Sequence, residues 1–152
     1  MDNPDEIRKM SKQRLKAAEI LITYDMPEDA FYLAGHSVEL SLKARLCEHF
    51  NFPNLFNLNE YNSDTPIPNI GNIKKITQIH NLDELMLLCG LYFKFTAFIQ
   101  TAPEILDNII LIRTFNDIRY KKIGSINTEK VKQIISFIND KENGLLQWIQ
   151  NN

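Results

Sequence analysis

The chain has 152 residues, the length of one ordinary domain, so we expect a single hydrophobic core. Apolar residues make up 44% and charged residues 24%, which excludes the disordered and fibrous classes of protein. There are 17 Lys and Arg against 19 Asp and Glu, giving a net charge of -2. A domain that binds duplex DNA usually carries a basic excess, so duplex DNA is not an expected partner.

The sequence also indicates a compartment. Its first residues are acidic and polar, without the basic start and apolar run of a secretory signal, and no stretch reaches the roughly 18 apolar residues of a membrane span. Cys47 and Cys89 have no Cys or His partner at metal-ligand spacing. We therefore expect a cytoplasmic protein with reduced thiols in its core, no membrane association, no metal and no cofactor.

Two long helices are expected first. Asn3 can cap a helix whose first turn contains Pro4 and two acids, and the apolar period continues to about residue 24. Asp25, Met26 and Pro27 repeat the same start signal, a cap followed by Pro and acids, and predict a second helix over about 27–50. Because the connection is so short, these two helices should pack as antiparallel neighbours.

The rest of the chain is also predicted to be helical, apart from one segment. Residues at about 51–79 are rich in Asn and Pro and keep no apolar period, which indicates a long irregular insertion, within which a strand or helical turn is still open. Helices are expected at 82–90, ending near Gly90, at 103–120 and at 128–149, and residues 92–99 favour a helix over a strand. The predicted fold is an all-α, up-and-down bundle of four to five helices.

A polar stripe runs along the second predicted helix. At 100° per residue, Tyr32, His36, Glu39 and Lys43 fall within an arc of about 60°, with apolar residues on both flanks. One interpretation is a satisfied network in which Glu39 bonds Lys43 or an Arg of another helix. The other is a groove of titratable groups that meets a ligand.

A second group of candidate residues ends the helix at 103–120. Arg113, Asp117 and Tyr120 share a face, and Arg113 with Asp117 is most simply an intrahelical ion pair. Arg119 and Tyr120, followed by two lysines, suit an anionic ligand or a phosphate. Because a buried carboxylate needs compensation, we expect Glu39 and Lys43 to approach Arg119 or Tyr120.

The sequence carries no glycine-rich phosphate loop, no Gly-x-Ser-x-Gly elbow and no His pair at zinc spacing. Two further histidines are expected to be structural: His80 should cap or orient the helix that follows it, and His49 lies at a helix end.

Three segments, in order, resemble the HEPN domain (higher eukaryotes and prokaryotes nucleotide-binding). The signature of its second helix is similar to residues 31–44, FYLAGHSVELSLKA. Its His-x-Leu-x-x-Leu helix is similar to residues 80–85, HNLDEL, and its aromatic-x-x-x-Arg-Tyr ending to residues 115–120, FNDIRY. The resemblance implies one helical domain over 1–152, often a homodimer, that binds a nucleotide or RNA or pairs with a nucleotidyltransferase in a toxin–antitoxin system.

The chain departs from the catalytic members of that family, which carry an Arg followed after four to six residues by a His. Counted from Arg113 or from Arg119, the positions where this His would stand hold Ile118, Arg119, Tyr120, Gly124, Ser125 and Ile126. We therefore expect a non-catalytic binding and dimerisation module with a ligand site made of His36, Glu39, Lys43, Arg113, Asp117, Arg119 and Tyr120. The alternative is a divergent metal-independent ribonuclease or toxin in which His36 or His80 supplies the imidazole.

Overall fold

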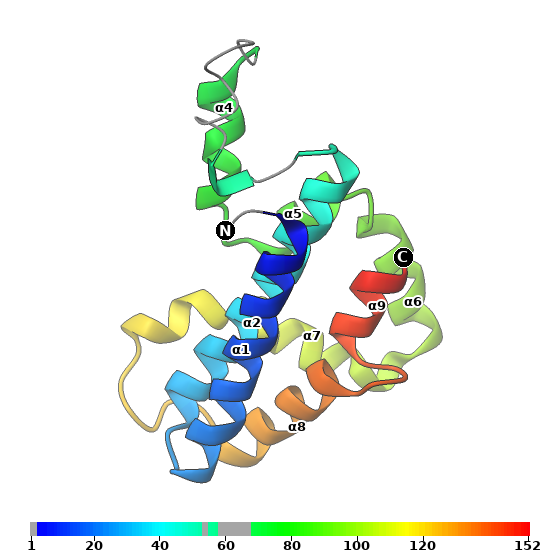
Figure 1. Ribbon diagram of the computed structural model, residues 1–152. Coiled ribbons are helices and arrows are strands. Elements are labelled where there is room, and N and C mark those ends of the chain that lie inside the picture. The colour runs from blue at the N-terminus through cyan, green and yellow to red at the C-terminus, as the bar shows by residue number, and fades with distance from the viewer. Residues whose placement is uncertain (1–2, 53–54, 58–67) are drawn as a thin grey trace.

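The computed structural model describes residues 3–52, 55–57 and 68–152, and these form an all-α bundle (Figure 1). Helices α1, Pro4–Thr23, and α2, Pro27–His49, pack as the predicted antiparallel hairpin. The side chain of Asn3 accepts a hydrogen bond of 3.0 Å from the backbone N–H of Glu6, as expected of a cap. The cap expected for α2 does not form, because Met26 stands at that position and makes no side-chain bond to the helix.

Helix α2 is the axis of the core, and α1, α5, α8, α9 and the segment that ends at Tyr120 all pack against it. Helix α1 approaches α2 closely at Ser11, a small buried residue whose hydroxyl donates to the carbonyl oxygen of Ser37 at 2.6 Å. Gly35 allows a second close approach, because a Cβ there would lie 2.1 Å from Cγ of Phe115. Small residues on α2 therefore decide how near its neighbours lie.

The prediction of one continuous helix at 103–120 is wrong. The chain forms a 3₁₀ turn η3, Pro103–Ile105, helix α7, Leu106–Ile112, and a 3₁₀ segment η4, Phe115–Tyr120. Phe115 and Ile118 are both buried. Side chains three residues apart point the same way in a 3₁₀ helix but diverge by about 60° in an α-helix, so the change of helix type turns both toward the core.

The helix predicted at 128–149 is likewise divided, into α8, Thr128–Asn139, and α9, Leu145–Asn151. The carboxylate of Asp140 accepts hydrogen bonds of 2.8 Å from the backbone N–H groups of Glu142 and Asn143 and so ends α8 in a tight turn. Gly144 closes the turn where a Cβ would lie 2.1 Å from the carbonyl oxygen of Asp140. The apolar period of this segment nevertheless continues across the turn, because its core-facing residues are all buried: Val131, Ile134, Ile135, Ile138, Leu145 and Ile149.

The predicted insertion at 51–79 is partly helical where it is described. It contains the 3₁₀ turns η1, Leu55–Asn57, and η2, Ile76–Gln78, and helix α4, Ile70–Lys75, which stands away from the bundle in Figure 1. The parts of this prediction at 53–54 and 58–67 lie outside the described residues. Of the alternatives that the sequence leaves open within this segment, residues 70–78 therefore adopt the helical one.

Helix α5, Leu82–Leu88, and helix α6, Tyr92–Thr101, complete the bundle. Gly90 has the predicted left-handed conformation between them, with φ 71°. No single helix among the described residues is long and apolar enough to cross a membrane, although α6 and residues 103–112, bent by 108°, together meet those two conditions. Within that bent pair, Phe95, Ile109 and Ile112 are buried in the core.

Both cysteines are free and buried. Burial raises the pKa of the Cys89 thiol to about 12, and the thiol donates to the carbonyl oxygen of Leu42 at 3.3 Å. The pKa of Cys47 is raised for the same reason. Neither thiol is therefore activated as a nucleophile.

Candidate functional site

The polar stripe of α2 divides into a buried part and an open part. In the buried part, Glu39 and Lys43 are each 2% exposed, and Nζ of Lys43 lies 2.6 Å from Oε1 of Glu39. The same ammonium donates to the carbonyl oxygen of Thr77 at 2.8 Å and lies 5.8 Å from the centre of the Phe56 ring. Lys43 therefore fastens the segment that follows α2 to the helix, and this half of the stripe is the satisfied network of the first interpretation.

The second oxygen of the Glu39 carboxylate is engaged by a histidine. Nδ1 of His80 lies 3.0 Å from Oε2 of Glu39, and the His80 side chain is 47% exposed. Since a carboxylate only accepts, this contact assigns a proton to Nδ1, and Nε2 is the ring nitrogen that Glu39 does not engage. The expectation that His80 caps the following helix is wrong, because the side chain of Asn81 caps α5 by accepting from the backbone N–H of Glu84.

The open part of the stripe begins at His36, which is half-buried one turn before Glu39 and stacks on the ring of Tyr32 at 5.9 Å. The pKa of His36 is lowered, chiefly by burial, against the opposing effect of Glu39. Arg14 of α1 lowers it further and has no hydrogen bond or ion pair among the described residues. A neutral imidazole at pH 7 follows.

Arg119 reaches the same stripe at Tyr32. Its guanidinium carbon lies 5.4 Å from the centre of the Tyr32 ring and 5.2 Å from that of Tyr120, so the group makes cation–π contacts with two aromatic residues. Its Nε donates to the carbonyl oxygen of Asn116 at 3.1 Å. Within the described part of the chain the two terminal nitrogens have no protein partner, and Tyr120 is 82% exposed.

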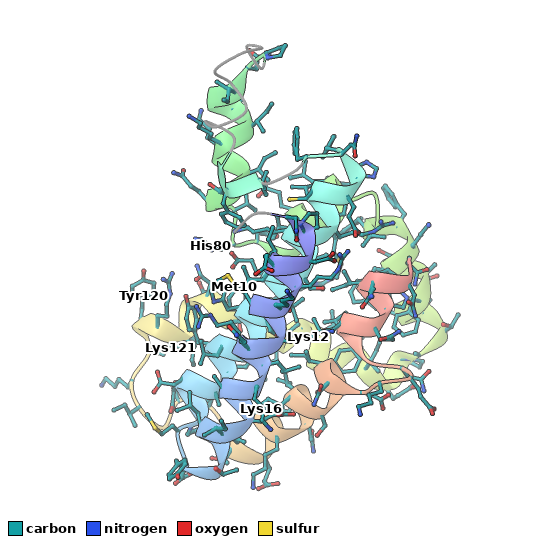
Figure 2. The ribbon with its side chains drawn as sticks, viewed as in Figure 1. Met10, Lys12, Lys16, His80, Tyr120 and Lys121 are labelled. Carbon is teal, nitrogen blue, oxygen red and sulfur yellow. The ribbon has the colours of Figure 1, made fainter. Side chains whose placement is uncertain are left out.

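The predicted approach of Glu39 and Lys43 to Arg119 or Tyr120 is therefore wrong as a hydrogen bond or ion pair. Both buried groups are satisfied by each other, by Thr77 and by His80. Arg119 lies at the other end of the stripe. In Figure 2, Tyr120 lies on η4, to the left of the α1–α2 pair.

Two further predicted site residues are elsewhere. Nε of Arg113 lies 3.0 Å from Oδ1 of Asp83 on α5, so the predicted pair with Asp117 does not form. Asp117 is exposed in η4, where the helical phase that would join it to Arg113 is lost. The break after α7 thus separates residues that an uninterrupted helix would align.

A hollow of about 360 Å³ lies beside Arg119, between the α1–α2 turn and η4. Arg119 and Lys121 stand on one wall, whereas Asp25, Glu28 and Asp29 stand on the other. The carboxylate of Glu28 is already engaged, because its Oε1 accepts from the backbone N–H groups of Gly124 and Ser125 at 2.6 and 3.0 Å. The hollow therefore offers cationic donors opposite the free carboxylate of Asp29.

The acidic wall was not part of the predicted site. Glu28 and Asp29 look in the sequence like an ordinary acidic first turn of a helix, and only the return of residues 118–125 to the start of α2 makes them face Arg119. The sequence offers His80 as a source of imidazole, but the pairing of His80 with Glu39 joins residues 41 apart in the chain. No local spacing signals such a contact.

Among the described residues, no group of three or more His, Cys, Asp or Glu side chains could hold a metal ion. Comparison with known proteins gives no match to any family model, to any curated protein or to any solved structure.

Proposed function

We propose that this chain is a non-catalytic binding module of the HEPN type, and that the hollow beside Arg119 takes a nucleotide-like ligand. The observation that supports this most is the Arg119 guanidinium, which is oriented by two tyrosine rings while its terminal nitrogens remain available at the rim. An oriented guanidinium forms bidentate hydrogen bonds to phosphate.

Each part of a nucleotide has a chemically suitable neighbour in or beside this hollow. The phosphate meets Arg119 and Lys121. The exposed ring of Tyr120 does not line the hollow but lies beside Arg119, where it offers a stacking surface for a base. Asp29, on the opposite wall, accepts hydrogen bonds from ribose hydroxyls or from a base amino group. A simple anion could not bond to the carboxylate of Asp29. The presence of both cations and a carboxylate in the hollow therefore favours a ligand that carries hydrogen-bond donors as well as a phosphate.

Binding of mononucleotides and short single-stranded RNA, followed by NMR or by fluorescence, tests the proposal. Arg119→Ala should weaken binding by roughly tenfold or more, because it removes a charge-assisted pair. The free energy of unfolding of the Arg119→Ala variant should change by less than about 0.5 kcal/mol, since the Arg119 side chain is exposed. Arg113→Ala is the matched control, because that arginine is paired with Asp83. Equal loss in both variants would contradict the assignment.

The proposal includes dimerisation and a possible partner protein. Helix α2 is covered by its neighbours within one chain. In the apolar run at 109–112, Ile109 and Ile112 are buried and Ile110 is 53% exposed, so little apolar surface is left there and the homodimer is proposed mainly from the resemblance. Sedimentation at micromolar concentration should still give a homodimer, and a monomer would reject this part. A nucleotidyltransferase encoded beside this chain would support the toxin–antitoxin version.

A divergent metal-independent ribonuclease is the second candidate, and the contact between His80 and Glu39 is the observation that favours it. A carboxylate that holds Nδ1 leaves Nε2 able to accept the 2′-hydroxyl proton of RNA. The freed 2′-oxygen would then bond to phosphorus while the 5′-oxygen leaves and takes a proton from water, because the lowered pKa of His36 keeps that imidazole neutral at pH 7. Cleavage lost in His80→Ala and retained in the matched His49→Ala would establish it, and absence of cleavage would reject it.

A further inference from the structure

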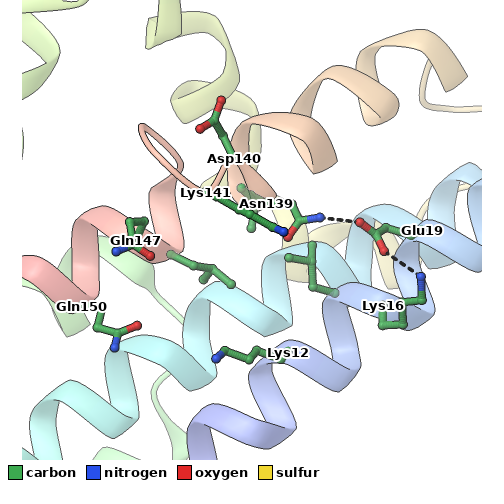
Figure 3. A pocket seen from close by; sticks show the side chains of 11 residues that line it. Lys12, Lys16, Glu19, Asn139, Asp140, Lys141, Gln147 and Gln150 are labelled. Carbon is green, nitrogen blue, oxygen red and sulfur yellow. Dashed lines mark hydrogen bonds and ion pairs between the residues drawn. The ribbon is translucent and has the colours of Figure 1, made fainter.

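A second hollow opens on a different side of α1 (Figure 3). It has a volume of about 350 Å³ and lies between α1, the end of α8 and α9, with an apolar floor of Leu15, Ile138 and Leu146. In Figure 2 its residues Lys12 and Lys16 lie on one side of α1, whereas Tyr120 and His80 lie on the other. This hollow is therefore separate from the one beside Arg119.

The carboxylates around this hollow are already engaged. Oε1 of Glu19 accepts from the side-chain amide of Asn139 at 2.5 Å, and its Oε2 lies 3.4 Å from Nζ of Lys16. Asp140 uses its carboxylate to accept two backbone N–H groups, which lowers its pKa. Figure 3 shows that this carboxylate points away from the hollow. Neither acid neutralises the remaining cations.

The uncommitted polar groups of the hollow are two ammonium groups and two amides. Lys12 of α1 and Lys141 of the α8–α9 turn line it and have no hydrogen-bond or ion-pair partner among the described residues, and neither have the side chains of Gln147 and Gln150 on α9. The turn that places Lys141 is fixed by the bonds of Asp140 and by the close packing of Gly144. Two positive charges from distant parts of the chain thus line one half-open hollow.

We propose that this hollow binds a phosphate monoester of a small polyhydroxylated molecule. A phosphate monoester carries about 1.5 to 2 negative charges at pH 7, which matches the two free ammonium groups. Gln147 and Gln150 both donate and accept, as neighbouring hydroxyl groups require, and the apolar floor suits the carbon skeleton. The volume lies at the lower end of small-molecule sites, so it fits one compact molecule and not a polymer chain.

Titration of the ¹⁵N-labelled chain with glucose 6-phosphate, followed by NMR, tests this. The expected result is saturable shifts of the amides of residues 138–150 and of those near Lys12, with no shifts from glucose and weaker binding of inorganic phosphate. Lys12→Gln and Lys141→Gln should each weaken binding of glucose 6-phosphate by roughly tenfold. Lys132→Gln, which removes the same charge from a lysine on α8 that pairs with Glu129, should leave it unchanged.

Five outcomes would overturn the proposal. The first four are the absence of shifts at millimolar glucose 6-phosphate, equal affinity for inorganic phosphate, shifts confined to the hollow beside Arg119, and equal weakening by all three lysine variants. The spectrum of each variant also reports whether it is folded, so a loss of binding is not confused with unfolding. Short RNA that shifts the same amides more strongly than glucose 6-phosphate would likewise reject a small-molecule site.

Discussion

The two halves of the polar stripe on α2 have the same sequence character and opposite surroundings. Glu39 and Lys43 are 2% exposed, whereas His36 is half-buried and Tyr32 carries the exposed Arg119 on its ring. Covering by α5 and the η2 segment turns the first half into a structural ion pair. Among the residues that the structure describes, the second half has no such cover, and under the proposed function it is the half that meets the ligand. The same helical pattern would then support stability at one end and recognition at the other.

The largest effect should come from the buried half. Lys43→Met leaves the carboxylate of Glu39 buried without its ammonium partner, and we expect a loss of about 3 kcal/mol in the free energy of unfolding. Chemical denaturation measures it. The double variant Lys43→Met with Glu39→Leu should recover much of the loss, because it leaves no buried charge. An unchanged denaturation midpoint in the single variant would show that Glu39 is not held as described.

The next effect concerns the close approach that brings η4, and with it Arg119, to α2. Gly35→Ala places a Cβ 2.1 Å from Cγ of Phe115, and overpacking of this kind costs about 1 to 3 kcal/mol. Nucleotide binding beside Arg119 should weaken as well, because η4 must shift. Gly71→Ala is the matched control: a Cβ in α4 has no neighbour within 4 Å, and the change should be neutral or stabilising by up to about 1 kcal/mol.

A smaller effect should distinguish the open half by its pH dependence. Because burial lowers the pKa of His36 below 6.5, the folded state binds its proton less readily than the unfolded state. Its stabilising contribution is complete above pH 6.5 and is lost as the pH falls from there through the lowered value. Denaturation midpoints between pH 7.5 and 5 should therefore fall less steeply in His36→Gln than in the unaltered chain, and parallel curves would contradict this assignment.

The smallest effect is expected at the exposed ion pair of Arg113 and Asp83, whose side chains are 36% and 37% exposed. Solvent screens such a pair, so Asp83→Asn should cost no more than about 1 kcal/mol, measured by the same denaturation. Raised salt should remove most of the difference. If Asp83→Asn lowered the free energy of unfolding as much as Lys43→Met does, the difference in solvent exposure would not explain the different strengths of the buried and the exposed ion pair.

Local signals in the sequence determined much of this protein. Pro and acidic residues set the starts of α1 and α2, Asn3 and Asn127 cap their helices, and the apolar period of residues 131–149 identified the buried face of α8 and α9 despite the turn between them. The stripe on α2 was visible too, because its spacing depends only on helical geometry.

Tertiary structure decided where the helices break and which groups meet. A Cβ is missing at Gly35 so that Phe115 can pack there, and Glu39 selects His80 in preference to Arg119. Both hollows join segments that lie far apart in the chain, such as Glu28 with Gly124 or Lys12 with Lys141. Helical period and capping act over three or four residues, whereas these contacts depend on how the finished helices pack, and only the folded chain supplies that information.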